Sequence, residues 1–353
     1  MGTGPKSERR GEMNFKLITF LLLLSVLCSC ERRDITYYME SEISVTADWS
    51  RAGLEEEKED GATLVIFPQD GSQPRVLLTG EREYTTVRLP LGTYDVVLFN
   101  RSFTDFNNLL FRGQDAVEAL EAYAREVVTR ASTRVIVSSP DKLAAATIRH
   151  FEVTDDMLGN YAPAASRTAC PAGACKMHFT PMPLTRRIQV TLNVKGLQNV
   201  REVRCTLYGV PLSVFLHDGH AGEELGGQEF TVGSPDFDEG SFTDGTMKGT
   251  LDVFGFDRSL SHSILLRALL VDGKTVIEQT LTDITVEEQT DEIGNITLHI
   301  EASVPKTFPD VKPEGGSDSG FDVGVDDWED DQQVDIPAVS YTHLRAHETC
   351  ADL

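Results

Sequence analysis

The feature that most constrains the fold is a strict two-residue alternation of apolar and polar side chains in short segments. In residues 41–49 (SEISVTADW) the apolar positions from Ile43 to Trp49 share one face, and residues 187–194 (RIQVTLNV) alternate in the same way. A period of two is typical of a β-strand with one buried face. Both halves of the chain are therefore predicted to contain half-buried strands.

Other segments of strand length follow at short intervals, separated by turn residues. The pairs Asp70-Gly71 and Asp272-Gly273 are typical of hairpin turns. Short strands at this spacing predict an all-β fold of antiparallel sandwiches or barrels. The remaining predicted strands are 62–67, 75–78, 83–89, 93–100, 135–137, 144–153, 199–208, 212–216, 229–232, 246–254, 262–271, 274–282 and 295–300.

One short helix is predicted within the first half. Asp115 is a suitable N-cap with Glu118 three residues later, and apolar residues recur at helical spacing as far as Val128. This apolar stripe is interpreted as core packing. Its members are Val117, Leu120, Ala124, Val127 and Val128.

Two end segments are set aside. Residues 1–12 precede a second methionine, Met13, which is the expected start. Residues 338–353 (AVSYTHLRAHETCADL) differ abruptly in character and look like a translated sequencing adapter. The ligand-type side chains in that segment are therefore not considered as a metal site: His343, His347, Glu348 and Cys350.

Residues 13–29 are predicted to be an export signal. The apolar run 17–27 follows Lys16 and is shorter than the ~20 residues that span a membrane. It ends in Leu27, Cys28, Ser29 and Cys30, which resembles a bacterial lipobox. The resemblance implies that the thiol of Cys30 receives acyl chains, palmitate among them, and becomes the mature N-terminus. The alternative is an ordinary secretory signal with a cysteine beside its cleavage site.

Charge and cysteine content restrict the remaining possibilities. The formal net charge is −24, so nucleic acid is excluded as a partner because its phosphates would be repelled. Cys170 and Cys175 (CPAGAC) close a small loop if they form a disulfide in an oxidising compartment, and are inert thiols otherwise. Cys205 is left unpaired. A zinc site is not predicted, since a fourth ligand is missing.

The predicted organisation has two domains and a tail. The first domain covers residues 30–178 and the second residues 179–302, after a proline-punctuated segment at 180–185. Residues 303–337 are rich in Pro, Gly and Asp and are predicted to be an acidic flexible tail. Alternation at Phe321, Val323 and Val325 makes this tail a candidate strand for the edge of a sheet, in its own or another subunit.

Two polar motifs are candidate metal sites with simpler interpretations. His217-Asp218-Gly219-His220 contains two histidines, but Asp-Gly is typical of a tight turn and no third ligand is defined. The turn is the favoured interpretation. A second, Gly-rich segment carries carboxylates without the order of an EF-hand, and a solvated loop is favoured over weak calcium binding. Its acidic residues are Asp236, Asp238, Glu239 and Asp244.

No catalytic motif is found, so no catalytic residue, cofactor or metal is predicted. The order of the lipobox, SEISVTADW, ATLVIFPQDG, TYDVVLFN and FTPMPLTRRIQVTLNVKGLQNVREVRCTLYGV resembles the fimbrillin-like lipoproteins of the Bacteroidota. Within this group it resembles in particular the minor and anchor subunits of type V pili and a related family of unknown function. Gly196, Leu197 and Gly209 contribute to this resemblance, which extends from Cys30 to Ile300.

The resemblance implies two tandem transthyretin-like β-sandwich domains and partners of the fimbrillin type, joined when a strand of one subunit fills a groove in the next. The sequence therefore predicts a non-enzymatic, lipid-anchored structural or adhesion protein of the outer membrane, such as a pilus accessory or anchor subunit. The alternative is a surface glycan-binding lipoprotein of a polysaccharide-uptake system, for which two tryptophans, Trp49 and Trp328, are few. An extracytoplasmic hydrolase is a third hypothesis.

Overall fold

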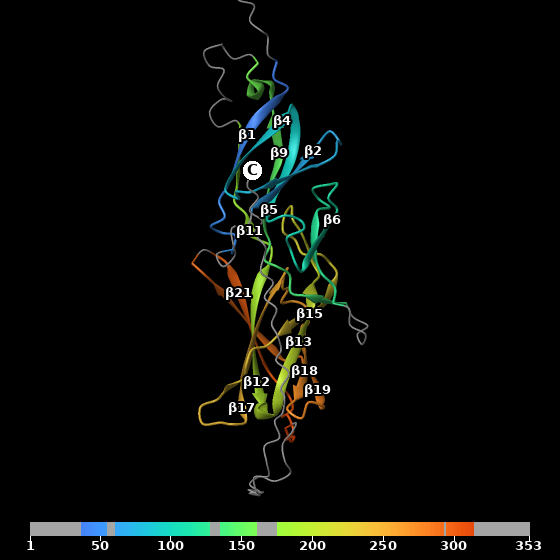
Figure 1. Cartoon of the computed structure of the whole chain (residues 1–353), viewed down its shortest axis with the longest axis vertical. Helices are drawn as coiled ribbons and strands as arrows, with labels where there is room; N and C mark the ends of the chain where they lie inside the picture. Colours follow the sequence, from blue (N-terminus) through green and yellow to red (C-terminus); the bar gives the residue numbers. More distant parts are fainter. Residues whose placement is uncertain (1–36, 55–60, 128–134, 161–174, 293, 314–353) are drawn as a thin grey trace, which may run out of the picture.

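The structure is a computed structural model that describes residues 37–54, 61–127, 135–160, 175–292 and 294–313. These residues form two lobes stacked along one long axis (Figure 1). They contain strands and two short 3-10 turns, η1 (Asp155–Leu158) and η3 (Leu197–Asn199), and no α-helix. The all-β class predicted from alternation is confirmed. No helix in the described residues is long and apolar enough to cross a membrane.

Two sheets face each other in the upper lobe. Their strands are β1 (Glu40–Ala47), β4 (Tyr84–Pro90) and β10 (Lys176–Phe179) in the order β10-β1-β4, and β11 (Met182–Pro183), β9 (Ala144–Val153), β5 (Gly92–Asn100), β2 (Ala62–Pro68) and β3 (Arg75–Thr79) in the order β11-β9-β5-β2-β3. Ile43 and Val45 of β1 share a buried cluster with Leu64 and Ile66 of β2. The alternation of residues 41–49 thus turns one face of β1 toward the core.

Strand β2 is buried from Ala62 to Phe67 and, apart from Thr63, apolar throughout, because both of its faces are covered. Val65 and Phe67 point away from the first core and belong to a second buried cluster. A third sheet contributes to that cluster in the order β14-β7-β6, with β6 (Leu109–Arg112), β7 (Glu121–Ala124) and β14 (Ser213–Phe215). A strand without a polar face is expected wherever a sheet lies between two layers.

Two short strands cross between the halves of the chain. β14 comes from the second half but pairs with β7, and β8 (Ile136–Ser138) comes from the first half but pairs in parallel with β15 (Leu225–Thr231) of the lower lobe. Backbone hydrogen bonds therefore join the two lobes in both directions.

The predicted helix at residues 115–128 is wrong. Turns occupy the segment up to Leu120, and β7 follows at once. Glu121 of β7 is only 6% exposed and pairs with the guanidinium of Arg112 on the neighbouring strand β6, at 2.9 Å between Nη2 and Oε1. This ion pair and the pairing of β7 with two strands outweigh the local helical pattern. The loop between β6 and β7 is tight: a Cβ on Gly113 would lie 1.8 Å from the carbonyl oxygen of Ala119.

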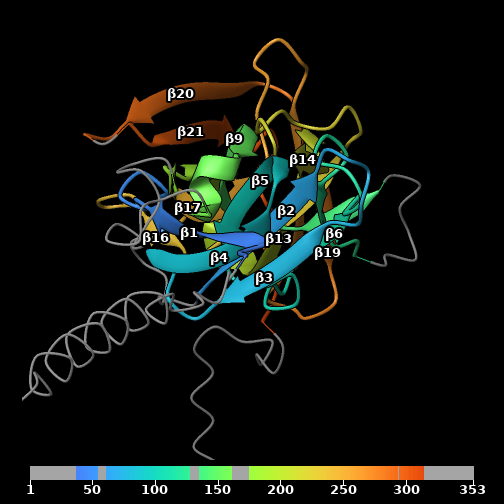
Figure 2. The same ribbon diagram turned by 90° about the horizontal axis from the view of Figure 1, so that it is seen from above.

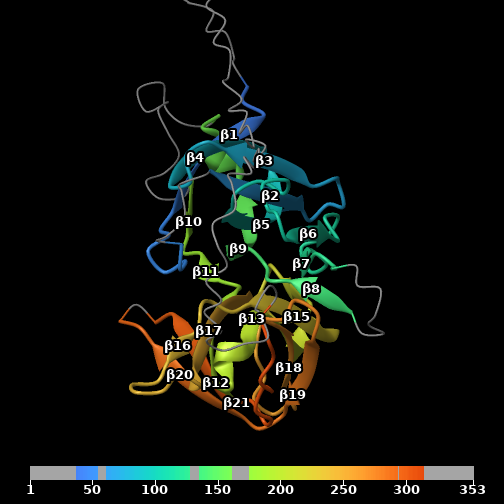
Figure 3. The same ribbon diagram turned by 60° about the horizontal axis from the view of Figure 1, so that its bottom comes forward.

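The lower lobe is a second pair of facing sheets (Figure 3). One has the order β16-β17-β12-β21-β20, with β12 (Arg186–Lys195), β16 (Asp236–Phe237), β17 (Asp244–Val253), β20 (Ile284–Thr290) and β21 (Ile296–Ser303). The other has the order β19-β18-β13-β15-β8, with β13 (Val200–Pro211), β18 (Ser263–Leu270) and β19 (Val276–Leu281). The predicted hairpin at Asp272-Gly273 connects β18 to β19. Asp272 accepts hydrogen bonds from the backbone N–H groups of Lys274 and Thr275 there.

The sequence prediction missed several strands, of which β20 is the longest. Only Ile284 and Val286 of β20 pack against the core, and the second half of the strand is exposed. An edge strand with two inward apolar residues gives a weak alternation signal. β20 lies at the margin of its sheet beside β21 (Figure 2).

A segment after β21 closes the lower end of the lower lobe. Phe308 is 2% exposed within the core of that lobe, and its backbone N–H donates to the carbonyl of Lys195 at 2.9 Å. The side-chain amide of the buried Gln279 both donates to the carbonyl and accepts from the N–H of Lys306, each at 2.9 Å. This C-terminal clamp, residues 304–312, is therefore part of the folded lobe.

Candidate functional site

The predicted lipobox, Leu27, Cys28, Ser29 and Cys30, lies outside the described residues, so lipidation stays a prediction. The described chain begins at the outer end of the upper lobe (Figure 1). The backbone of Tyr38 is held there by two hydrogen bonds to the side chain of Asn160. The N–H of Tyr38 donates to Oδ1 at 2.8 Å, and its carbonyl accepts from Nδ2 at 2.9 Å.

The predicted disulfide is described at one end only. Cys175 is buried and disulfide-bonded, and its Sγ lies 3.5 Å from Oγ of Ser41 on β1. Cys170 lies outside the described residues, so its pairing with Cys175 stays a prediction. Cys175 immediately precedes β10. Its backbone carbonyl accepts a hydrogen bond from the N–H of Ser44 on the neighbouring strand β1, at 2.9 Å.

Cys205 is a free, fully buried thiol on β13. Burial raises its pKa to about 12, because the thiolate would lose its hydration inside the lower core. A thiol in this setting is neither a nucleophile nor a metal ligand at neutral pH. Cys205 is therefore a packing residue.

The pKa of Cys205 predicts a specific dependence of stability on pH. An unfolded thiol ionises near pH ~8.5, whereas the folded thiol stays neutral up to about pH 12, so the free energy of unfolding falls as pH rises between these values. Between pH 8.5 and pH 10 we expect wild type to lose about 2 kcal/mol relative to a Cys205→Ala variant. Urea denaturation of both proteins at the two pH values measures this. A wild-type-to-variant difference that does not change with pH would contradict it.

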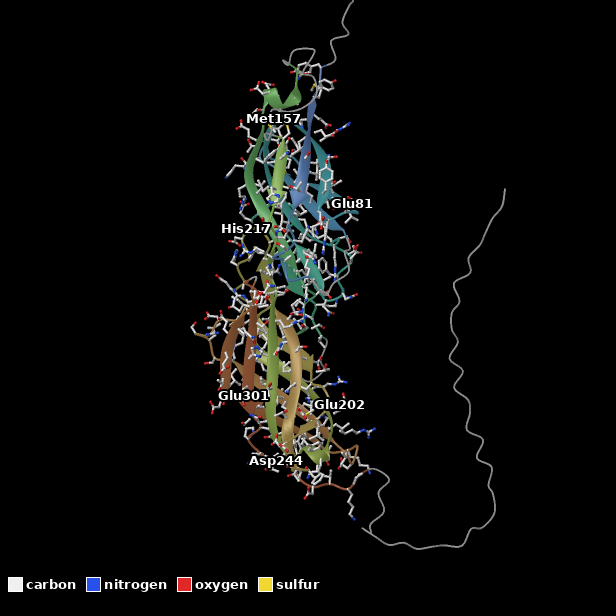
Figure 4. All side chains as sticks on the ribbon, turned by 90° about the vertical axis from the view of Figure 1, so that its left-hand side faces the viewer. Glu81, Met157, Glu202, His217, Asp244 and Glu301 are labelled. Atoms are coloured by element: carbon white, nitrogen blue, oxygen red, sulfur yellow. The ribbon has the colours of Figure 1, made fainter. Side chains whose placement is uncertain are left out.

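The His217-Asp218-Gly219-His220 motif forms the tight turn that the sequence favours. It follows β14, and the turn is closed by hydrogen bonds from the N–H of Phe215 to the carbonyl of His220 and from the N–H of Gly219 to the carbonyl of Phe215, both 2.9 Å. Gly219 has φ +75°, in the left-handed region that favours glycine. Figure 4 shows His217 on the flank of the upper lobe, toward the waist of the molecule.

The turn brings both imidazoles to a single carboxylate. Nε2 of His217 lies 3.2 Å from Oδ2 of Asp218, and Nδ1 of His220 lies 2.5 Å from Oδ1. Partial desolvation raises the pKa of Asp218, but hydrogen bonds from His220 and the charges of the two imidazoles outweigh this and leave the pKa below its ordinary value. The ring of His220 stacks on Phe215 with centroids 4.2 Å apart. The sequence analysis missed Asp218 as a third ligand-type group.

The acidic Gly-rich segment is not assembled into a comparable group. Asp236 lies on β16 and Asp244 begins β17, at the lower end of the molecule (Figure 4). Within the described ranges, the group of three ligand-type side chains with converging atoms is His217, Asp218 and His220. The solvated loop is the connection at residues 238–243, which contains Asp238 and Glu239, whereas Asp236 and Asp244 belong to the paired strands β16 and β17.

A buried carboxylate in the upper lobe has a structural role. Asp95 of β5 lies opposite two residues of β9 at a bulge, where Oδ1 accepts from the N–H of His150 at 2.8 Å and Oδ2 from Nη1 of Arg149 at 3.1 Å. His150 has φ +54°, so this hydrogen bond holds a residue in the left-handed region. Arg149 also donates to Glu118 at 2.8 Å. The network stabilises the bulge.

Several sheets end in strands with only one described neighbour. β20 is bonded only to β21 and β3 only to β2 among the strands described. Val76 and Leu78 on β3 are exposed on the same face as the buried Val65 of β2. Outer strands of this kind present unpaired backbone groups to which another strand can add.

These features define a class: an elongated all-β protein of two lobes, whose sheets end, among the strands described, in outer strands with a single neighbour. The family can also be stated. The model for a domain of unknown function, DUF5119, matches residues 29–230, more than half of the chain, and the chain belongs to this family.

Relatives connect the chain to fimbriae. A protein of Bacteroides ovatus named as fimbrium anchoring subunit Fim4B is 29% identical over 145 residues, which are 38% of this chain and 40% of that protein. The match thus spans about two fifths of the relative's length. The predicted relationship to fimbrium subunits is confirmed at this level.

A solved structure shares the fold. A crystal structure from Bacteroides ovatus described as an adhesin has a TM-score of 0.53 and 17% identity, over 71% of this chain and 86% of that one. The fimbrial anchor protein Mfa2 from Porphyromonas gingivalis has a TM-score of 0.40 and 9% identity, over 76% of this chain and 100% of that one.

Proposed function

We propose that this protein is a lipid-anchored, non-enzymatic subunit of a fimbrium-type assembly on the cell envelope, with an anchoring or accessory role. The relationship to the Bacteroides anchoring subunit is the observation that carries this proposal. The proposed architecture is two tandem transthyretin-like β-sandwich domains, residues 30–178 and 179–302. The facing sheets of each lobe and the fold shared with the Bacteroides ovatus structure support it.

The positions of the described chain ends support an orientation for the anchored protein. The chain enters at the outer end of the upper lobe, whereas the C-terminal clamp, residues 304–312, lies at the opposite end of the lower lobe (Figure 1). Seven residues from Cys30 to Tyr37 span at most about 25 Å. Acylation at Cys30 would therefore hold the upper lobe near the membrane, with the lower lobe and its C-terminal clamp farther from it.

The proposed contact with other subunits is strand addition. β20 is seven residues long, has a single described neighbour, and turns Ile284 and Val286 toward the lower core. A strand from another subunit that pairs with this edge would satisfy its free backbone groups and extend the apolar face. Of the acidic tail predicted at residues 303–337, the part beyond the C-terminal clamp, which carries Phe321, Val323 and Val325, is the corresponding donor proposed for this chain.

The test is affinity capture from detergent-solubilised outer membranes of the native bacterium, with the tagged full chain as bait. We expect fimbrium subunits to be recovered with it, identified by mass spectrometry. An unrelated outer-membrane lipoprotein with the same tag is the control for carry-over in detergent micelles. Recovery of polysaccharide-uptake proteins in place of fimbrium subunits would overturn the proposal in favour of a glycan-binding lipoprotein.

A further inference from the structure

We propose that His217, Asp218 and His220 form a binding site for a divalent transition metal of the zinc type. One ligand atom from each of the three residues lies within 4.8 Å of the other two. This inference does not depend on the proposed function.

The chemistry of the three donors selects the class of metal. Imidazole nitrogen with one carboxylate oxygen is a donor set that suits zinc and its neighbours, whereas calcium and magnesium prefer oxygen ligands alone. A tetrahedral zinc site with bonds of about 2.0–2.1 Å places neighbouring ligand atoms about 3.3 Å apart. Nε2 of His217 lies at about that spacing from Oδ2 of Asp218, 3.2 Å, whereas Nδ1 of His220 lies closer, 2.5 Å from the other oxygen, Oδ1, in a hydrogen-bond contact that a metal would replace. A modest approach of the two imidazoles is the remaining adjustment.

The backbone holds these side chains in place before any metal binds. The hydrogen bond from Gly219 to Phe215 and the pairing of Phe215 with His220 close the turn, and the N–H of His220 donates to Oδ1 of Asp218 at 3.1 Å. The N–H of Leu216, in the same turn, donates to the carbonyl of Leu120 at 3.0 Å and fixes the turn to the upper lobe. Preorganised ligands reduce the conformational cost of binding.

A cavity beside the turn is a second, independent observation. It has a volume of about 310 Å³, and His217, Asp218 and Gly219 line one side of it, with Ile148 of β9 and His178 of β10 also in its wall.

Exposure leaves room for the rest of the coordination sphere. The side chains of Asp218 and His220 are 49% and 53% exposed, while that of His217 is 15% exposed. Three protein ligands leave a fourth position of a tetrahedral site to water. The site would therefore be open on the solvent side.

The experiment measures zinc binding by the full chain, purified in detergent without a polyhistidine tag and stripped with a chelator. Isothermal titration with zinc chloride should give a site that is lost in His217→Ala and His220→Ala. We expect each variant to raise Kd at least about 10-fold, since even outer-shell partners of zinc ligands have effects of that size. Binding of Co²⁺ should give the visible absorption of a low-coordinate site in wild type and not in either variant.

Two control variants locate the site. His299→Ala removes a surface histidine of β21 that contacts Gln289, and His343→Ala with His347→Ala removes the histidines near the end of the chain. Both controls should retain wild-type affinity. Unfolding curves recorded without metal show whether each variant is folded, and zinc should raise the Tm of wild type only when His217 and His220 are present. The proposal is overturned if wild type binds no zinc, or if the two controls and not the turn variants abolish binding.

Discussion

Replacing Cys30 by serine should abolish acylation completely and release the protein from the outer membrane. A serine hydroxyl does not replace the thiol that receives the diacylglyceryl group, so no thioether anchor forms. Stable attachment requires two or more acyl chains, so a protein without them should be released from the membrane. Labelling with radioactive palmitate, followed by membrane fractionation, measures both effects.

Cys28→Ser is the matched control for this experiment. It alters a neighbouring thiol in the same short segment, which the prediction assigns to the removed signal, and it should retain full labelling. The ordinary secretory signal predicts a different result, in which neither substitution changes fractionation. A Cys30→Ser protein that is still labelled and still membrane-bound would exclude the lipid anchor.

Phe308→Ala should be the most destabilising single substitution in the C-terminal clamp. The ring is 2% exposed within the lower core, and truncation of a buried phenylalanine costs about 3–5 kcal/mol in free energy of unfolding. The backbone around it has little room to relax, since a Cβ on the adjoining Gly196 would lie 2.4 Å from the Phe308 carbonyl oxygen. Denaturation by urea, monitored by circular dichroism, gives the change.

Phe242→Ala is the control for this prediction. That side chain is 86% exposed in the same lobe, so its removal should change the free energy of unfolding by no more than about 0.5 kcal/mol. Similar effects of the two substitutions would show that residues 304–312 are not an integral part of the lower lobe.

Strands with a clear pattern were predictable because the signal is local. Residues 144–153 and 62–67 correspond to β9 (Ala144–Val153) and β2 (Ala62–Pro68), and the turn at Asp272-Gly273 connects β18 and β19 as expected. Continuous apolarity or a two-residue period reports directly which faces of a strand are buried. The hairpin dipeptide acts through its own backbone preferences.

Failures occurred where distant residues decide the local structure. Glu121 lies within the segment predicted to be a helix. It is part of strand β7 instead, because β7 pairs with both β6 and β14 and Glu121 forms an ion pair with Arg112 of β6. The partner β14 is about ninety residues away in sequence. β20 is likewise recognisable only beside β21, because its own alternation involves two inward residues.

At the candidate metal site, residues 217–220, local sequence and tertiary packing again decide different features. The Asp-Gly dipeptide by itself determined a tight turn, since Gly219 supplies the left-handed backbone. That the carboxylate of Asp218 lies between two imidazoles, beside a cavity bounded by β9 and β10, was decided only by the packing of the turn on the upper lobe.

By itself, the sequence determined the all-β class, most strand positions and the prediction of a lipid anchor, because each depends on residues that are neighbours in the chain. The tertiary structure alone decided that β8 and β14 cross between the lobes, that residues 115–124 are turns and a strand, and that the C-terminal clamp closes the lower core. Those outcomes depend on pairing and burial between distant segments, whose free energy no local pattern records.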